Sequence, residues 1–255
     1  MLREQLLNRG IGHEPDFRWR GEEVSRLEGF SDAVFGFVIT LLVISTEVPK
    51  TFTDLTLAFN FSNVGSFVFC FLTLVLLWHS HYVFFRRYGL EDGPVFLLNA
   101  GFLCVVALYV YPLKFLFGWM LSGFPVADAT TPLTEATPIR VDQASQLMVI
   151  YGLGVVLLYL THIGLYAWAY HKRGALDLTS VESFDTLTTI GTDCVFVSIA
   201  LVSILIAIVG GSDSVAWAGL IYALLPLLIF IFRGYRRRQH DAMRARANVN
   251  EQQPA

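Results

Sequence analysis

Charged residues are scarce in this chain of 255 residues, and those present are unevenly placed. Asp, Glu, Lys and Arg make up 15% of the residues, whereas soluble domains carry about a quarter. Hydrophobic residues make up 55%, and the mean hydropathy is +0.56. Because the charges cluster between long apolar stretches, the sequence predicts an all-α integral membrane protein that crosses the bilayer several times.

Cysteine is also rare. Cys70, Cys104 and Cys194 each lie inside an apolar stretch and lack the spacing of metal ligands. Their odd number and placement indicate small core residues and give no disulfide framework. A cleavable signal pattern is missing as well, since residues 1–25 are polar and charged. The first apolar stretch is therefore predicted to be a retained helix.

Several functional motifs are absent from the sequence. It has no T-V-G-Y-G filter, no regularly spaced arginines of a voltage sensor, no Walker motif, no G-x-S-x-G and no Cys/His cluster. His79 and His81 point about 200° apart on a helix, so they cannot share one metal ion without other ligands. We therefore expect no enzyme activity, no metal, no cofactor and no nucleic-acid partner.

The apolar stretches predict six transmembrane helices. Their approximate ranges are 29–47, 64–86, 94–118, 145–170, 188–209 and 214–232. Pro112 is expected to kink or end the third helix, and Pro226 to interrupt the sixth. The predicted organisation is an N-terminal cytosolic arm over residues 1–28, a six-helix transmembrane domain over 29–233, and a basic cytosolic tail over 234–255. We expect the arm to be partly helical or mobile, with no separate function.

The positions of lysine and arginine predict the orientation in the bilayer. The arm holds five, the loops after the second and fourth helices hold two each, and the tail holds six, which gives 15 of the 18 on one side. By the positive-inside rule, both termini are predicted to be cytosolic. The arginines at the start of the tail are interpreted as determinants of this topology rather than as a specific lipid site. The chain is thus expected to be a multi-pass protein of the cell membrane.

The first predicted helix has two distinct faces. At 100° per residue, one stripe is apolar with a single hydroxyl at its edge, and it consists of Phe30, Ala33, Phe37, Leu41 and Ile44 with Thr40. Ser31 and Asp32 lie on the other side. Because lipid is unfavourable for a carboxylate, this polar side is predicted to pack against other helices of the protein. A simpler interpretation is that both residues cap the helix or interact with its dipole.

The start of this helix carries a specific motif. Arg26 followed by Phe30-Ser31-Asp32 gives R-x-x-x-F-S-D, and the segments Ala33-Val34-Phe35 and Ile39-Thr40-Leu41-Leu42-Val43 continue the same pattern. In this motif the chain resembles the transmembrane protein 175 family of potassium channels. The resemblance implies a potassium-permeable cation channel with a leak-like character, which assembles as a homotetramer with its first helices around a central pore.

The resemblance also implies roles for residues of the apolar stripe. The family positions that narrow the pore correspond to Phe37, Leu41 and Ile44, and the threonine associated with potassium selectivity corresponds to Thr40. Phe37 is larger than the Ile or Leu expected at its position, which puts conductance and selectivity in question. An apolar constriction of this kind controls ions by dewetting. For an anonymous membrane protein, ordinary helix packing would be the commoner interpretation of the same stripe.

Polar residues of the second and third helices are candidate partners for Ser31 and Asp32. Trp78, His79 and His81 are predicted to lie at the same depth as Asp32, and each can donate a hydrogen bond. The resemblance implies that the motif holds the first helix beside the others. Asn99 with the later Pro112 loosely resembles the family pattern in the third helix.

Three other functions remain as alternatives. A secondary transporter would need charged residues in mid-membrane, and Asp193, predicted near the start of the fifth helix and flanked by Thr189 and Thr192, is the one candidate. A membrane enzyme would need a convergent catalytic set, which is not evident. Proton permeation through the same path is a variant of the channel hypothesis.

Overall fold

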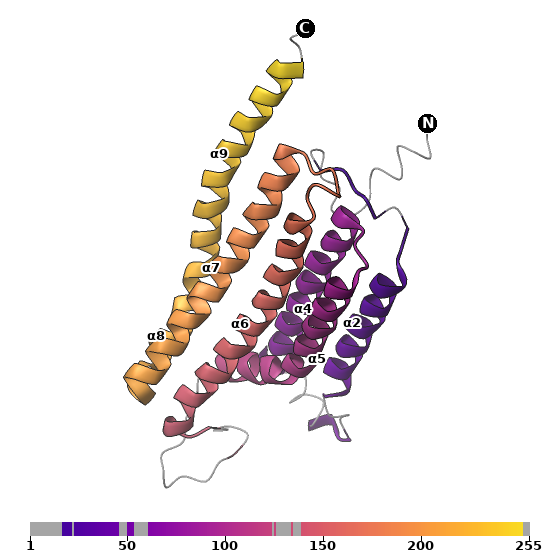
Figure 1. The fold of residues 1–255 in the computed structure, drawn as a ribbon. Coiled ribbons are helices and arrows are strands. Elements are labelled where there is room, and N and C mark those ends of the chain that lie inside the picture. The colour runs from indigo at the N-terminus through magenta and orange to yellow at the C-terminus, as the bar shows by residue number, and fades with distance from the viewer. Residues whose placement is uncertain are drawn as a thin grey trace.

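The computed structural model describes residues 17–21, 23–45, 50–53, 61–123, 125, 134 and 139–251, and its regular structure in these residues is helical (Figure 1). The α-helices are α2 (Arg26–Ile44), α4 (Phe61–Tyr88), α5 (Gly93–Leu121), α6 (Val141–His171), α7 (Ser180–Gly210), α8 (Val215–Leu220) and α9 (Leu225–Glu251). Two 3₁₀ turns, η1 (Gly211–Ser214) and η2 (Ile221–Leu224), flank α8.

Six helical segments of the described chain are long and apolar enough to cross a membrane. They are α2, α4, α5, α6, α7 and the combined segment Val215–Asp241, each at least 19 residues long. A bilayer core needs roughly 20 apolar residues in a helix. The predicted all-α membrane fold with six spanning helices is thereby confirmed.

Capping places two helix starts earlier than predicted. The Ser25 side chain accepts a hydrogen bond from the Glu28 N–H at 3.0 Å, so α2 begins at Arg26 rather than at residue 29. Thr179 and Glu182 form a capping box, which starts α7 at Ser180 rather than at residue 188. Asp193 consequently lies in the middle of α7, and its predicted placement near the start of the helix was wrong.

Two prolines within the spans have different effects. Pro112 does not end α5, which continues to Leu121. Pro226 lies at the second position of α9, directly after the 3₁₀ turn η2 that interrupts the sixth span. Because proline lacks an N–H and its ring clashes with the carbonyl four residues earlier, the regular helix gives way there to a tighter turn.

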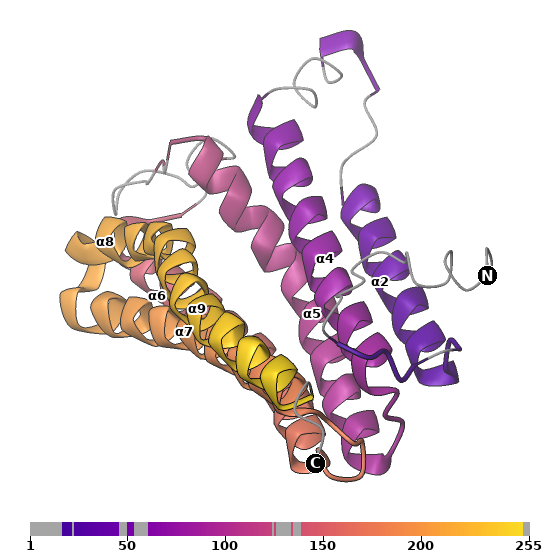
Figure 2. The same ribbon diagram turned by 90° about the horizontal axis from the view of Figure 1, so that it is seen from above.

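The helices pack in an order that leaves α2 at one edge. It packs against α4 and α5, while α6 packs between α5 and α7, and α9 packs against α7. Figure 1 shows α2 on one side of the bundle and α9 on the opposite side, and Figure 2 shows α4 and α5 between α2 and the remaining helices. The apolar core of this part joins one face of α2 to α4 and α5, and includes Phe35, Val38, Leu42, Leu74, Phe102 and Val106.

Residues 17–25, apart from residue 22, precede α2 and lie against the bundle. We call them the arm segment, and the end of the bundle that they cross the arm end. Arg20 reaches Glu182 in the first turn of α7, and Arg86 near the end of α4 reaches Glu28 in the first turn of α2. The starts of α2 and α7 and the end of α4 therefore lie together at the arm end.

Candidate functional site

One face of α2 is left uncovered by the rest of the chain. Phe30, Phe37 and Ile44 are 61%, 62% and 69% exposed, Thr40 is also exposed, and Leu41 is half-buried. The opposite face is buried and consists of Ser31, Phe35, Val38 and Leu42. The apolar stripe predicted from the sequence is thus free to line a pore, to contact another copy of the chain or to face lipid.

Thr40 is a polar residue on this uncovered face. Its hydroxyl donates to the Gly36 carbonyl one turn earlier at 2.9 Å. Because the proton is used within the helix, the oxygen presents its lone pairs to whatever lies beside the stripe. Gly36 adds no side chain, and an added Cβ there would meet no atom within 4 Å. The hydroxyl oxygen is therefore an available ligand for water or a cation.

Asp32 interacts with α4 on a different side of α2. The Trp78 indole N–H donates to the Asp32 carboxylate at 2.7 Å. The Trp78 ring also stacks on Tyr82, with ring centroids 5.8 Å apart. The carboxylate at the start of the spanning helix is thus paired with an N–H donor of the same chain.

A buried hydrogen-bond network joins α2, α5 and α4. Asn99 Nδ2 donates to Ser31 Oγ at 3.0 Å, and Ser31 Oγ donates to the Leu27 carbonyl at 2.8 Å. His81 Nε2 lies 2.6 Å from Asn99 Oδ1. Since that oxygen can only accept, His81 must carry its proton on Nε2. His81 Nδ1 has no hydrogen-bond partner among the described residues.

The remaining motif and partner residues lie apart from this network. His79 stacks on Tyr82 with centroids 6.4 Å apart, on another side of α4 from His81. Arg26 is exposed in the first turn of α2. At the other end of that helix, Lys114 of α5 donates to Ser45 Oγ at 2.8 Å. Among the described residues, no group of three His, Cys, Asp or Glu side chains is placed to hold a metal ion.

Sequence reasoning did not find a second buried network between α4, α6 and α7. Ser80 Oγ lies 2.8 Å from His162 Nε2, and His162 Nδ1 lies 2.7 Å from Asp193 Oδ2. His162 and Asp193 are both buried. The available signal was a histidine and an aspartate inside two apolar spans, because ionisable residues there almost always pair with one another.

This network has the atom order of a hydrolase triad but lacks the accompanying donors. Ser80 lies within α4, where backbone N–H groups are engaged with carbonyls four residues earlier. The helix around Ser80 therefore offers no free N–H pair to stabilise an oxyanion, which acyl-transfer chemistry requires. The contacts instead join three helices through polar side chains.

Sequence comparisons give consistent similarities. Residues 26–109 match the family described as the endosomal/lysosomal potassium channel TMEM175. The chain is 36% identical to a potassium channel of Marivirga tractuosa over 227 aligned residues. These residues cover 87% of this chain and 91% of that relative. A potassium channel of Streptomyces collinus is 32% identical over 94 residues, which cover 35% of this chain and 46% of that relative.

Two crystal structures are similar to the fold. A variant of the potassium channel MtTMEM175, in complex with a nanobody–MBP fusion protein, superposes with a TM-score of 0.74 at 33% identity, covering 88% of this chain and 98% of that chain. A lysosomal potassium-selective channel TMEM175 homologue from Chamaesiphon minutus superposes with a TM-score of 0.50 at 19% identity, covering 83% and 96%. At 19% identity, the similarity to the second structure supports the fold alone.

Proposed function

This chain belongs to the TMEM175 family, and on that premise we propose that it is a potassium channel whose pore is lined by α2 from several copies of the chain. The observation that carries the proposal is the uncovered stripe of α2, which begins at the R-x-x-x-F-S-D motif inside the matched region. Such a path is permeable to potassium, and the flux through it is passive and leak-like.

In this proposal Phe37, Leu41 and Ile44 from each copy form an apolar constriction. A cation in such a ring must shed water with no polar group to replace it, so the width of the ring sets conduction. Thr40 lies on the same face, and its hydroxyl oxygen is the proposed contact for potassium during selection. Trp78 and Asn99 bond the other sides of α2, and His81 bonds Asn99 in turn, which keeps the stripe turned away from the subunit's own core.

A single α2 cannot enclose a pore, so the proposal requires an oligomer. The edge position of α2 allows copies of this helix to meet around one axis (Figure 2). We propose a homotetramer, for which the mass of the assembled protein is about four times 28.6 kDa.

The arm end is proposed to face the cytosol, because 15 of the 18 lysines and arginines belong to it by sequence. Both termini are then cytosolic, and the location is the cell membrane. The division into an arm (1–28), a channel domain (29–233) and a basic tail (234–255) is part of the same proposal. The matched family consists of ion channels, and we assign no enzymatic activity to this chain.

Potassium flux tests the proposed function directly. Purified protein in liposomes with a potassium gradient is expected to dissipate the gradient passively, and in a planar bilayer it is expected to give unitary current steps. Flux that depends stoichiometrically on a second solute would instead support a secondary transporter. A current that follows the proton gradient and not the potassium gradient would support the proton-permeable variant.

The constriction is tested by a polar substitution on the stripe. Phe37→Asn is expected to increase the unitary potassium conductance, because an amide in the ring stabilises water where the phenylalanines exclude it. Val43→Asn is the matched control, since Val43 is 53% exposed but lies about 120° from Phe37 on the helix. Unchanged conductance in Phe37→Asn would contradict the constriction.

A further inference from the structure

An ion pair between Arg20 and Glu182 attaches the arm segment to the bundle, and every hydrogen-bonding position of both side chains is used. All five N–H donors of the Arg20 guanidinium are used: Nε donates to Leu176 O at 2.7 Å, Nη1 to Arg18 O and Glu182 Oε1, and Nη2 to Asp177 O and Glu182 Oε2. The side chains of Arg20 and Glu182 are 13% and 2% exposed. A lysine could not reproduce this contact, because it has neither the number of donors nor the planar fork.

Glu182 is saturated in the same way. Its two oxygens accept from the Arg18 and Thr179 backbone N–H groups at 2.8 Å each, as well as from Arg20 at 3.0 Å. A carboxylate offers about four acceptor positions, and all are occupied here. The start of α7 is therefore bonded both to its own cap and to the arm segment.

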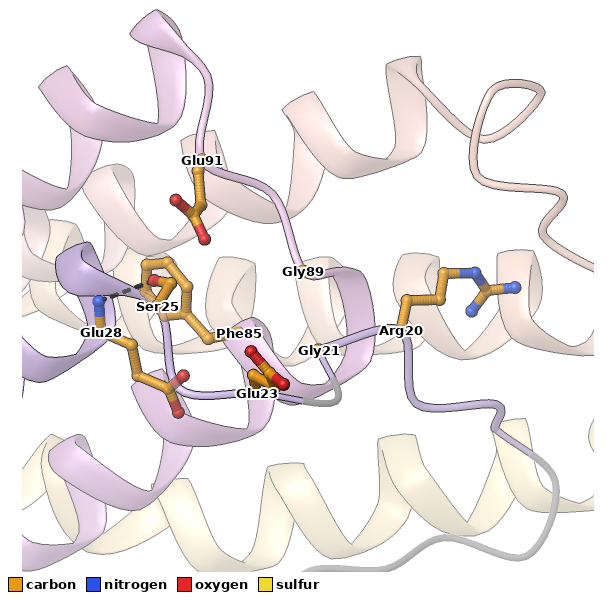
Figure 3. Close-up of a pocket in the computed structure, with 8 residues that line it drawn as sticks. All are labelled: Arg20, Gly21, Glu23, Ser25, Glu28, Phe85, Gly89 and Glu91. Carbon is orange, nitrogen blue, oxygen red and sulfur yellow. Dashed lines mark hydrogen bonds between the residues drawn. The ribbon is translucent and has the colours of Figure 1, made fainter.

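The arm segment crosses the end of α4 with unusually close backbone contact (Figure 3). The Arg20 and Gly21 N–H groups both donate to the Arg86 carbonyl at 3.1 Å, and Arg86 Nη1 donates back to the Gly21 carbonyl at 2.8 Å. An added Cβ on Gly21 would lie 2.4 Å from the Phe85 carbonyl oxygen. Gly89, at φ +58, faces Arg20 with a Cβ position 3.0 Å from its carbonyl oxygen.

Arg86 extends this connection to α2. Its Nη2 donates to both carboxylate oxygens of Glu28 at 2.6 Å, and its Nε donates to one of them at 3.1 Å. The side chains of Arg86 and Glu28 are 9% and 4% exposed. Glu182, Arg20, Arg86 and Glu28 thus form a continuous polar connection from α7 through the arm segment and α4 to the base of α2.

A cavity of about 270 Å³ lies beside this connection. It is lined by Arg20, Gly21, Glu23, Ser25, Glu28, Phe85, Gly89 and Glu91 (Figure 3). At its upstream end the arm segment is packed, because Phe17 is buried against Tyr88 and beneath the Arg87 guanidinium. Next to α2, however, open space replaces side-chain packing. On this side the base of α2 is therefore held by the Arg86–Glu28 ion pair, while Trp78 and Asn99 hold its other sides.

We propose that Arg20 is a positioning residue for conduction, which acts through Gly21 and Arg86 to fix the base of α2. The inference rests on the proposed function, in which α2 lines the pore. With the arm segment held, the constriction stays narrow, and release of Arg20 lets α2 move outward and the apolar ring become wet. The expected effect is on how often the pore opens and not on the ion path once it is open.

Glu182→Gln tests the proposal in the full-length protein. Glutamine preserves the capping box with Thr179 but removes the charge that Arg20 requires. We expect the open probability to rise about tenfold, with unitary conductance and the potassium-to-sodium permeability ratio unchanged. Arg20→Lys is also expected to raise the open probability without changing the unitary conductance or the permeability ratio. Lysine keeps the positive charge but lacks the planar guanidinium that bonds both Glu182 oxygens. Unchanged or lowered open probability in these variants overturns the proposal.

Gly21→Ala provides a second variant that alters no charge. Its Cβ would displace the arm segment from the Phe85 carbonyl, whereas Gly174→Ala, also outside the spans, would meet no atom within 4 Å and serves as the control. Gly21→Ala is expected to raise open probability, and Gly174→Ala to leave it unchanged. A merely structural role would lower thermal stability in Gly21→Ala and leave gating as in the wild type, which also overturns the proposal.

Hydrogen exchange separates this inference from the proposed function. Amides of residues 17–21 and 23–25 are expected to exchange faster in Gly21→Ala and Glu182→Gln than in Gly174→Ala or the wild type, because release of the arm segment exposes them. Equal exchange in all four proteins overturns the role of Arg20. Absence of potassium flux in the wild type would overturn the channel proposal, while the exchange experiment would still decide whether Arg20 holds the arm segment.

Discussion

Asp32 illustrates how a carboxylate is accommodated at the start of a membrane-spanning helix. The Trp78 N–H donates to it at 2.7 Å, while the Trp78 ring remains stacked on Tyr82. The hydrogen bond and the ring contact are therefore separable by substitution. Hydrogen bonds to charged groups contribute about 1.5–3 kcal/mol, which is large enough to measure in the purified protein.

Trp78→Phe removes the N–H and keeps an aromatic ring. We expect a loss of about 1.5–3 kcal/mol in stability, seen as a lower thermal unfolding midpoint in detergent. Trp217→Phe is the control, because Trp217 is 67% exposed and its truncation should change little. Asp32→Ala should act more strongly, because it leaves the Trp78 N–H without its acceptor, and it should lower the yield of assembled oligomer. A stable, fully conducting Asp32→Ala protein would contradict this role.

Asp92 connects the start of α5 to the end of α6 outside the spans. Its carboxylate accepts from the Val95 N–H, from the Trp168 indole at 3.0 Å and from Lys172. Partial burial alone would raise the pKa of Asp92, but the hydrogen bonds from Lys172, Trp168 and the Val95 N–H, with the Lys172 charge, hold its pKa below the ordinary value. The folded protein therefore favours the charged form.

The lowered pKa of Asp92 predicts that the protein loses stability as the pH falls. Because the folded pKa is lowered, the contribution of Asp92 is fully present above the ordinary carboxyl pKa of about 4 and is lost as the pH falls through the lower folded value. Asp92→Asn keeps an equally good cap and should be less stable than the wild type by up to about 1 kcal/mol at pH 7, given the partial exposure of the pair. At strongly acid pH the difference should disappear. Thermal unfolding at several pH values measures it, and a difference that grows toward acid pH would contradict the assignment.

At the scale of the helix, local signals in the sequence determine most boundaries. Long apolar stretches predicted all six spans, because length and hydropathy alone decide which segments can cross a bilayer. The start of α7 was predicted eight residues late, although Thr179 and Glu182 have the spacing of a capping box. The polar residues that follow this motif delayed the predicted start of the helix to the first long apolar stretch.

Contacts between helices were harder to predict than the helices themselves. Trp78, His79 and His81 were proposed as partners of Asp32 because they lie near its depth in the membrane, and Asn99 was proposed as a further interhelical polar partner. Which of them bonds Asp32 and which bonds Ser31 depends on the rotation of α4 and α5, which sequence periodicity does not fix. The pairing of His162 with Asp193 was missed for the same reason, since it depends on which faces of the neighbouring helices α6 and α7 meet.

Close packing between α5 and α6 yields a prediction at this scale. A Cβ on Gly154 of α6 would lie 2.0 Å from the Tyr109 ring of α5, and that ring is tethered because its hydroxyl donates to the Tyr151 carbonyl at 2.8 Å. Gly154→Ala is therefore expected to destabilise the protein by about 1–3 kcal/mol through overpacking. Gly118→Ala, where an added Cβ meets nothing within 4 Å, should be neutral or stabilise by up to ~1 kcal/mol. Thermal unfolding of both variants gives the comparison, and equal midpoints would contradict close helix contact there.

At the scale of the whole molecule, the arrangement of the helices separates a covered side from an uncovered one. The buried face of α2 joins the apolar core shared with α4 and α5, whereas the outward face lies at the edge of the bundle (Figure 2). Large apolar side chains are also exposed along α7 and α9, as expected for a lipid-facing surface. Exposure in one copy of the chain therefore does not distinguish a pore-lining residue from a lipid-facing one, and access to water is the property that does.

Cysteine accessibility measures that property residue by residue. The native Cys70, Cys104 and Cys194 are first replaced by alanine, and Phe37→Cys, Ile44→Cys and Val43→Cys are then introduced singly. The cysteine thiolate, which forms in water and not in lipid, attacks a charged, water-soluble thiol reagent.

Potassium current in Phe37→Cys and Ile44→Cys should be blocked by the reagent, while Val43→Cys should conduct as before. The distinction is sharp because Ile44 and Val43 are adjacent in sequence, equally close to the end of α2, and both more than half exposed. Only rotation about the helix axis, about 100° between neighbours, separates them. Block of Val43→Cys without block at Phe37 and Ile44 would mean that another face of α2 borders the ion path.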